Sequence, residues 1–177
     1  SGTTFAAVAS LIQDDHYGED YLKGLAANEV MIESGSTAIT KLQTGECAAI
    51  MILEESILKV LKEAEDAGTP ITNLACIYPE DGVVLIPSTV MTVAEDHSAN
   101  VNIEACEAVE QWLLSEEAQK LILEGYMHSV FAGMKEIPFN SVDTDGLIEK
   151  DLGVDWENAY QNREAINTAW TEIVTTK

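Results

Sequence analysis

The spacing of apolar residues predicts an alternation of helices and strands over the first part of the chain. Apolar residues fall on one helical face over residues 5–12, 34–44 and 54–67, so three amphipathic helices are expected there. Residues 48–53 form a continuous apolar run, which is typical of a strand covered on both faces of a sheet. Residues 71–78 are expected to form a second strand. This alternation indicates βαβ units and an α/β fold class.

Helices are expected to dominate the second part of the chain. Residues 83–94 form a long β-branched run, in which Pro87 suits a sheet edge, a bulge or a crossing between lobes. Beyond this run, Asn102, Ser115 and Asp155 are placed to begin amphipathic helices.

A loop and a final helix complete the pattern. Residues 135–153 contain a proline, an asparagine and several aspartates, which indicates a loop. After that loop, Trp156, Tyr160 and Trp170 share one side of a single final helix, and this stripe is expected to be core packing.

The charge of the chain restricts its partners. The 31 acidic residues against 9 basic ones give a formal net charge of -22. This charge opposes binding to nucleic acid or to anionic membranes, because both need Lys and Arg. The cysteines Cys47, Cys76 and Cys106 are odd in number and show no CxxC spacing, so buried free thiols are expected.

Two expected helix starts have the composition of an anion site. A helix start presents unpaired backbone N–H groups and the positive end of the helix dipole, and both favour a negatively charged ligand. Simple helix capping is the alternative for each. The residues of the two starts are Ser1, Gly2, Thr3 and Thr4, and Ser34, Gly35, Ser36 and Thr37.

Acidic residues follow both expected strands. Glu54 and Glu55 come directly after residues 48–53, and Glu80 and Asp81 lie in a turn after residues 71–78. Open α/β sheets hold ligands at the carboxyl ends of their strands, so Glu54, Glu80 and Asp81 are candidate ligand contacts. The alternative is a first-turn acid that favours the helix dipole, or an ordinary turn residue.

Tyr126 and His128 are further candidate ligand contacts, on a segment that connects two expected helices. Each has an apolar body and a polar tip, so a partly buried structural role is the alternative. The sequence contains no Gly-x-Ser-x-Gly elbow, no P-loop, no dinucleotide fingerprint and no zinc-type spacing. We therefore expect no catalytic residue, no metal and no cofactor, and a protein that is not an enzyme.

The order of several motifs resembles the later part of a type II periplasmic solute-binding protein of an ABC transporter, in the ferric-iron and phosphonate-like branch. The resemblance runs from Ser1 to about Pro138, and its most specific part is the helix pair at residues 102–120. The other motifs are Ser-Gly-Thr-Thr at 1–4, Ser-Gly-Ser-Thr at 34–37, Thr-Gly-Glu at 44–46, Tyr-Pro-Glu-Asp-Gly at 78–82 and Tyr-Met-His-Ser-Val at 126–130.

The resemblance implies two α/β lobes with a ligand in the cleft between them. It implies the substrate-binding component of an ABC importer, which captures a small organic anion and delivers it to a membrane permease without chemistry. The anion would carry a phosphate, phosphonate, sulfonate or carboxylate group. The resemblance also implies a periplasmic or extracellular location, with a lipid anchor as an option in the full-length protein.

The resemblance further implies a division of the chain between the lobes. Residues 1–84 and 136–177 would form the second lobe, and residues 85–135 would be a returning segment of the first lobe, whose N-terminal part lies outside this chain. That segment would lack its neighbouring strands. It would then pack on the second lobe, on another chain or on a copy of itself in a homodimer, because exposed strand edges and apolar faces favour association.

One position departs from the family pattern. Ferric binders of this type carry a Tyr-Tyr pair where this chain has Glu54 and Glu55, after Leu53. Phenolates are strong ligands for hard metals, so their absence disfavours iron(III). A carboxylate there would instead pair with a cationic part of an organic ligand or coordinate a hard divalent cation. An effector-sensing regulatory domain of the same fold is the alternative function, and an enzyme built on the fold is a third.

Overall fold

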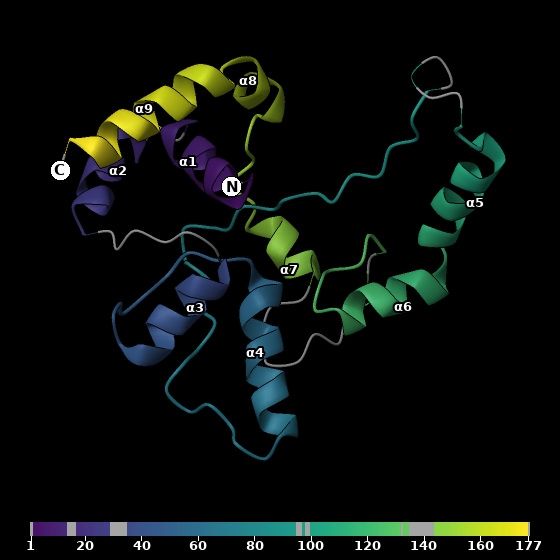
Figure 1. Ribbon diagram of the computed structural model, residues 1–177, viewed down its shortest axis with the longest axis horizontal. Coiled ribbons are helices and arrows are strands. Elements are labelled where there is room, and N and C mark those ends of the chain that lie inside the picture. Colours follow the sequence, from purple (N-terminus) through teal and green to yellow (C-terminus); the bar gives the residue numbers. More distant parts are fainter. Residues whose placement is uncertain are drawn as a thin grey trace.

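The computed structural model describes residues 2–13, 17–28, 35–94, 97, 100–131, 133–134 and 144–176. Figure 1 shows the helices in three groups: α1, α2, α8 and α9 together, α3 and α4 below them, and α5 with α6 in an arm to one side. The described residues contain nine helices, which are α1 (Gly2–Gln13), α2 (Gly18–Ala27), α3 (Gly35–Thr44), α4 (Glu54–Asp66), α5 (Ile103–Leu113), α6 (Glu116–Glu124), α7 (Thr144–Glu149), α8 (Trp156–Gln161) and α9 (Arg163–Thr175).

The main core lies among α1, α2, α8 and α9, so the two ends of the chain pack together. Alanines at Ala9, Ala26 and Ala159 are almost fully buried, and their small side chains let the helices approach closely. Leu22 fills the space between them and is fully buried. The Gln13 side chain exchanges two hydrogen bonds with the backbone of Asp155, which fixes the end of α1 against the start of α8.

The expected helix boundaries in the middle of the chain are confirmed. The side chain of Asn102 accepts a hydrogen bond from the Ala105 N–H at 3.0 Å, and the side chain of Ser115 accepts one from the Ala118 N–H at 3.2 Å. The side chain of Asp155 caps α8 in the same way. Capping residues act through bonds to their own helix, which is why the sequence alone locates them.

The expected sheet is not confirmed. Residues 48–53, 71–78 and 84–94 form no helix, and the described residues show no strand, only one isolated parallel bridge between Val83 and Asp151. A strand exists through hydrogen bonds to a neighbouring strand, and these segments have no such neighbour within the described part of the chain. The α/β class therefore rests on the apolar pattern and not on an observed sheet.

The last third of the chain differs from the expectation in two ways. The expected loop contains α7, whose Leu147 is buried, although residues 135–143 lie outside the described residues. The expected final helix is divided at Asn162 into α8 and α9. Because this break changes the direction of the helix face, Trp170 packs against the core, whereas the Tyr160 side chain is 67% exposed.

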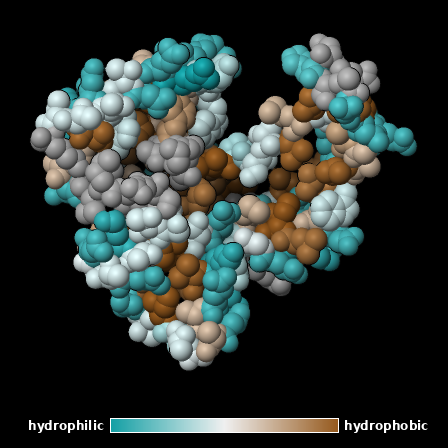
Figure 2. Space-filling model, in the orientation of Figure 1, coloured by the Kyte–Doolittle hydropathy of each residue, from teal (hydrophilic) through white to brown (hydrophobic). Residues whose placement is uncertain are grey.

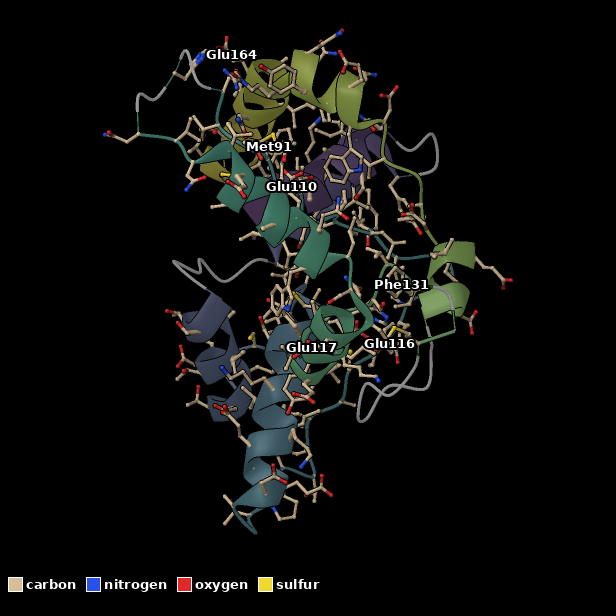
Figure 3. The ribbon with its side chains drawn as sticks, turned by 90° about the vertical axis from the view of Figure 1, so that its right-hand side faces the viewer. Met91, Glu110, Glu116, Glu117, Phe131 and Glu164 are labelled. Carbon is tan, nitrogen blue, oxygen red and sulfur yellow. The ribbon has the colours of Figure 1, made fainter. Side chains whose placement is uncertain are left out.

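The arm, which we define as residues 86–130, leaves many apolar side chains in contact with solvent. Helix α5 has no buried residue and packs mainly on α6. Figure 2 shows hydrophobic surface along the arm and facing the rest of the molecule, and Figure 3 shows Met91 beside Glu110 of α5. The exposed large apolar residues of the arm are Ile86, Val90, Met91, Val93, Val109, Trp112, Leu114, Leu121, Met127 and Val130.

The described helices are all too short or too polar to cross a membrane.

Candidate functional site

Three distant parts of the chain meet at the carboxylate of Glu54. The Tyr78 hydroxyl donates a hydrogen bond to Glu54 Oε1, and His128 Nε2 lies 2.6 Å from Glu54 Oε2. We call these three residues the Glu54 triad. The side chains of Glu54 and His128 are each 20% exposed, so the pair is largely shielded from water but still accessible from outside.

Local sequence places Glu54 at this point. The residue before it, Leu53, has extended backbone angles and provides no side-chain cap for α4. Glu54 and Glu55 therefore occupy the first turn, where a negative charge is stabilised by the helix dipole. Tyr78 lies in the non-helical segment that follows α4, directly before Pro79.

The segment that carries His128 is held in place by a buried amide. The Gln119 side chain is only 2% exposed and donates to the backbone oxygen of Leu113 at 2.8 Å. Its oxygen accepts hydrogen bonds from the Ser129 hydroxyl at 2.8 Å and from the Val130 N–H at 2.9 Å. These bonds fix the two residues after His128 and so restrict where the imidazole can point.

The chain reaches His128 through an unusual backbone conformation. Helix α6 ends at Glu124 with Gly125 as its C-cap, and Tyr126 follows with a φ of 64°, which is rare for a residue with a side chain. This left-handed residue turns the chain sharply after α6. The Tyr126 N–H and the Met127 N–H donate to the backbone oxygens of Leu123 and Ile122, which stabilise the turn.

Tyr78 remains a neutral phenol at physiological pH. Burial, followed by its hydrogen bond to the Glu54 carboxylate, raises the pKa of Tyr78 far above the usual tyrosine range. Burial likewise raises the pKa of Cys76, which lies beside Tyr78. Cys76 is a free thiol, like Cys47 and Cys106, and all three are half-buried rather than fully buried as expected.

Of the residues that the sequence singles out, Glu54 and His128 are brought together. Sequence reasoning missed Tyr78, although its position at the end of an expected strand beside Glu80 was an available signal. Tyr126 is half-buried two residues before His128.

Asp81 is bonded to a residue outside the triad. Asp81 Oδ2 accepts a hydrogen bond from the Tyr17 hydroxyl at 2.7 Å, and Glu80 is exposed. The turn next to them packs tightly, because Gly82 has a φ of 139° and a Cβ built there would lie 2.6 Å from the Lys150 backbone oxygen. The structure thus gives Asp81 a contact that joins the turn to the start of α2.

The two expected anion sites are described only in part. Ser1 and Ser34 lie outside the described residues, and Gly2, Thr3 and Thr4 are described only as part of the helical backbone of α1. Helix α3 begins at Gly35, with Gly35 and Ser36 exposed and Thr37 half-buried. Figure 1 shows α1 and α3 beginning toward the middle of the molecule.

A shallow groove of about 270 Å³ runs between α4 and the extended segment that follows it. Its lining is mostly apolar and comes from Leu61, Glu65, Pro70, Ile71, Leu74, Ala75 and Cys76. Ligand sites normally add several converging polar groups to such a lining, and this groove has only Glu65. The Glu54 triad therefore has the better chemistry for a ligand.

The triad is poorly suited to a metal ion. Across the described residues, no group of three or more His, Cys, Asp or Glu side chains is placed to hold a metal. Hard divalent cations take several oxygen ligands, whereas the triad offers one carboxylate, one neutral phenol and one imidazole. Its donors and acceptors fit polar groups of an organic molecule better.

Residues 1–150 match the family model described as bacterial extracellular solute-binding protein. No curated protein and no solved structure matches the chain.

Proposed function

Because the chain belongs to the bacterial extracellular solute-binding proteins, which bind solutes outside the cytoplasm, we propose that it captures a small organic anion for an ABC importer. The family implies a ligand and a membrane permease as partners, and its members generally carry out no chemistry. The proposal adds that the ligand carries a phosphate, phosphonate, sulfonate or carboxylate group. It also places the chain in the ferric-iron and phosphonate-like branch of the family.

The observation that carries the proposal is the convergence of three chain segments on Glu54. Glu54, Tyr78 and His128 come from the start of α4, the end of an extended segment and the turn after α6. A fixed, partly exposed set of polar groups contributed by separate segments is typical of a ligand site. The N-termini of α1 and α3 are the proposed binding points for the anionic group, through their backbone N–H groups.

The net charge of -22 does not exclude an anionic ligand. Charges on the far side of the molecule are screened within about 8 Å at physiological ionic strength. The field at a helix start is set mainly by its own N–H groups, which act over the first turn. Local dipoles therefore outweigh the distant carboxylates at such a site.

We also propose the division into lobes that the family fold implies. The main core joins α1 and α2 to α8 and α9, which supports grouping residues 1–84 with 136–177. The arm falls inside residues 85–135 and exposes many apolar side chains, as a piece of another lobe would do without its neighbouring strands. Closure of two lobes around the ligand would then be the conformational change that a permease detects.

The test is a titration of the 177-residue chain with inorganic phosphate, methylphosphonate, ethanesulfonate and acetate, against glucose and choline as neutral and cationic controls. Saturation-transfer NMR at millimolar ligand detects weak binding. We expect at least one anion to bind and both controls to fail. We also expect calorimetry to show no binding at micromolar ligand, because one lobe makes only part of the ligand contacts. Binding of glucose or choline with no binding of any anion would refute the proposal.

A further inference from the structure

The closely packed helices fall into two separate groups. Helices α1, α2, α8 and α9 pack on one another in the main core, and α5 packs on α6 in the arm. Across the described residues, no helix of the arm packs extensively on a helix outside it. Figure 1 shows the arm leaving the middle of the molecule toward α5 and returning along α6. The position of the arm therefore depends on contacts made where the chain leaves and where it returns.

Backbone hydrogen bonds hold the chain where it leaves for the arm. The Val83 N–H donates to the Lys150 oxygen at 2.9 Å, and the Leu152 N–H donates to the Val83 oxygen at 2.9 Å. The Leu85 N–H then donates to Asp151 Oδ1 at 3.2 Å. This bridge is isolated, so it fixes where the arm begins and leaves the direction of the arm to other contacts.

The returning chain is joined to α4 through His128. Its Nε2 lies 2.6 Å from Glu54 Oε2. The buried Gln119 side chain of α6 bonds the Leu113 oxygen at the end of α5 and also bonds the two residues that follow His128. His128 is thereby tied to both helices of the arm, and a shift of its ring would carry α5 and α6 with it.

The other half of this contact is fixed as well. The Tyr78 hydroxyl donates to Glu54 Oε1, so the carboxylate is already oriented by a residue on the same side of the contact. Both the Glu54 and the His128 side chains are 20% exposed, and shielding from water strengthens a polar contact between them. Two preassembled halves thus meet at this carboxylate, one from residues 1–84 and one from residues 85–135.

We propose that the Glu54–His128 contact is a latch between the two lobes, which holds the arm against α4 when no ligand is bound. This inference rests on the proposed function, because that function assigns residues 1–84 and 85–135 to different lobes. The latch regulates the binding site by setting the arrangement of the lobes that a solute first meets. Breaking it would let the arm sample a wider range of orientations while each part keeps its own fold.

The experiment measures how the arm tumbles in the ligand-free 177-residue chain. The ratio of transverse to longitudinal nitrogen-15 relaxation rates of backbone amides falls when a segment reorients faster than the rest of the protein. In the wild type we expect α5 and α6 to tumble with α1, α2 and α9. The variant His128→Phe keeps a ring and loses the contacting nitrogen, so it should lower the ratio in α5 and α6 and leave the main core unchanged. Each amide is compared with itself in the wild type, so the direction of its helix does not affect the result.

Two further variants test the assignment to Glu54. Glu54→Ala should release the arm from the other side of the contact, and the double variant with His128→Phe should release it no further than either change alone. Glu55→Gln changes the neighbouring acid of the same helix turn and should leave the arm latched. Circular dichroism and the main-core amides check that each variant is folded, and either single variant can decide if the other unfolds.

The outcomes separate this inference from the proposed function. Independent tumbling of the arm in the wild type, or an unchanged ratio in the latch variants, would overturn the latch. Release of the arm by Glu55→Gln would overturn its assignment to Glu54. These measurements contain no ligand, so a failed latch leaves the anion titration to stand or fall by its own result, and a failed titration leaves the relaxation result intact.

Discussion

Leu22 offers the clearest test of how the chain is held together. Its side chain is fully buried among residues of α1, α2 and α9, including Val8, Ile166 and Ile173. Truncation to alanine removes three carbon atoms, which corresponds to about 2.4 kcal/mol of lost transfer free energy at about 0.8 kcal/mol each. The cavity left behind adds to this cost, because the neighbouring helices already pack closely and cannot collapse fully.

We therefore expect Leu22→Ala to lower the free energy of unfolding by about 3 kcal/mol, within the usual range for buried leucines. For a chain of this length the melting temperature should fall by about 6–12 °C. Urea unfolding followed by circular dichroism and by tryptophan fluorescence measures the loss, since Trp170 packs against this core.

The matched control is Leu121→Ala, the same substitution on α6 at a side chain that is 50% exposed. It should change the free energy of unfolding by about 0.5 kcal/mol or less. A cost below about 1 kcal/mol for Leu22→Ala, or equal costs for the two variants, would contradict a core in which α2 is packed between the two ends of the chain.

Three further predictions concern the site and its supports. Gly82→Ala should destabilise the chain by more than about 1 kcal/mol in a thermal melt, because the backbone has a φ of 139° and the new Cβ meets a backbone oxygen; an unchanged melting temperature would contradict the tight turn. Gln119→Ala should cost about 1–3 kcal/mol in urea unfolding, because the Ser129 hydroxyl and Val130 N–H lose their acceptor, whereas an exposed Gln43→Ala on α3 should cost almost nothing. The raised pKa of Tyr78 means that its neutral form favours the folded state, so this contribution is present below the unfolded tyrosine pKa of about 10 and is lost as pH rises above it. The free energy of unfolding, measured from about pH 8 to about pH 11, should therefore fall more steeply for the wild type than for Tyr78→Phe. The same pH dependence in both proteins would refute the buried hydrogen bond as the cause.

The helices were largely predictable because their signals are local. Apolar residues at helical spacing located α3 and α4, and side chains at Asn102 and Ser115 cap their own helices. The division at Asn162 was not predicted, because apolar residues continue at helical spacing on both sides of it, although asparagine is itself a weak helix former. Its consequence, an exposed Tyr160, depends on how α8 meets the rest of the core.

The expected strands, in contrast to the helices, were not predictable from local signals. Residues 48–53 have the apolar run of a buried strand, yet Met51 is 66% exposed and the segment pairs with no neighbour in the described part of the chain. A helix completes its hydrogen bonds within one segment, whereas a strand depends on another segment that its own sequence does not identify. For that reason an apolar run marks a candidate strand, whereas its pairing partner has to come from the rest of the fold.

The candidate site, too, was only partly predictable from the sequence. Glu54 and His128 were chosen as separate candidates from their places after an expected strand and between expected helices, and no spacing rule joins residues 74 positions apart. Tyr78 was not chosen as a candidate, although it ends an expected strand.

By itself, the sequence determined the helices, their caps, the acidic character of the chain and its membership of a solute-binding family. Only the tertiary structure decided which candidates meet. It brings Tyr78 and His128 to the Glu54 carboxylate, and it places Asp81 in a hydrogen bond with Tyr17. It also leaves the apolar side chains of the arm exposed. The reason is that hydrogen bonds within a helix link near neighbours along the chain, whereas a binding site is made by contacts between segments whose separation the sequence does not encode locally.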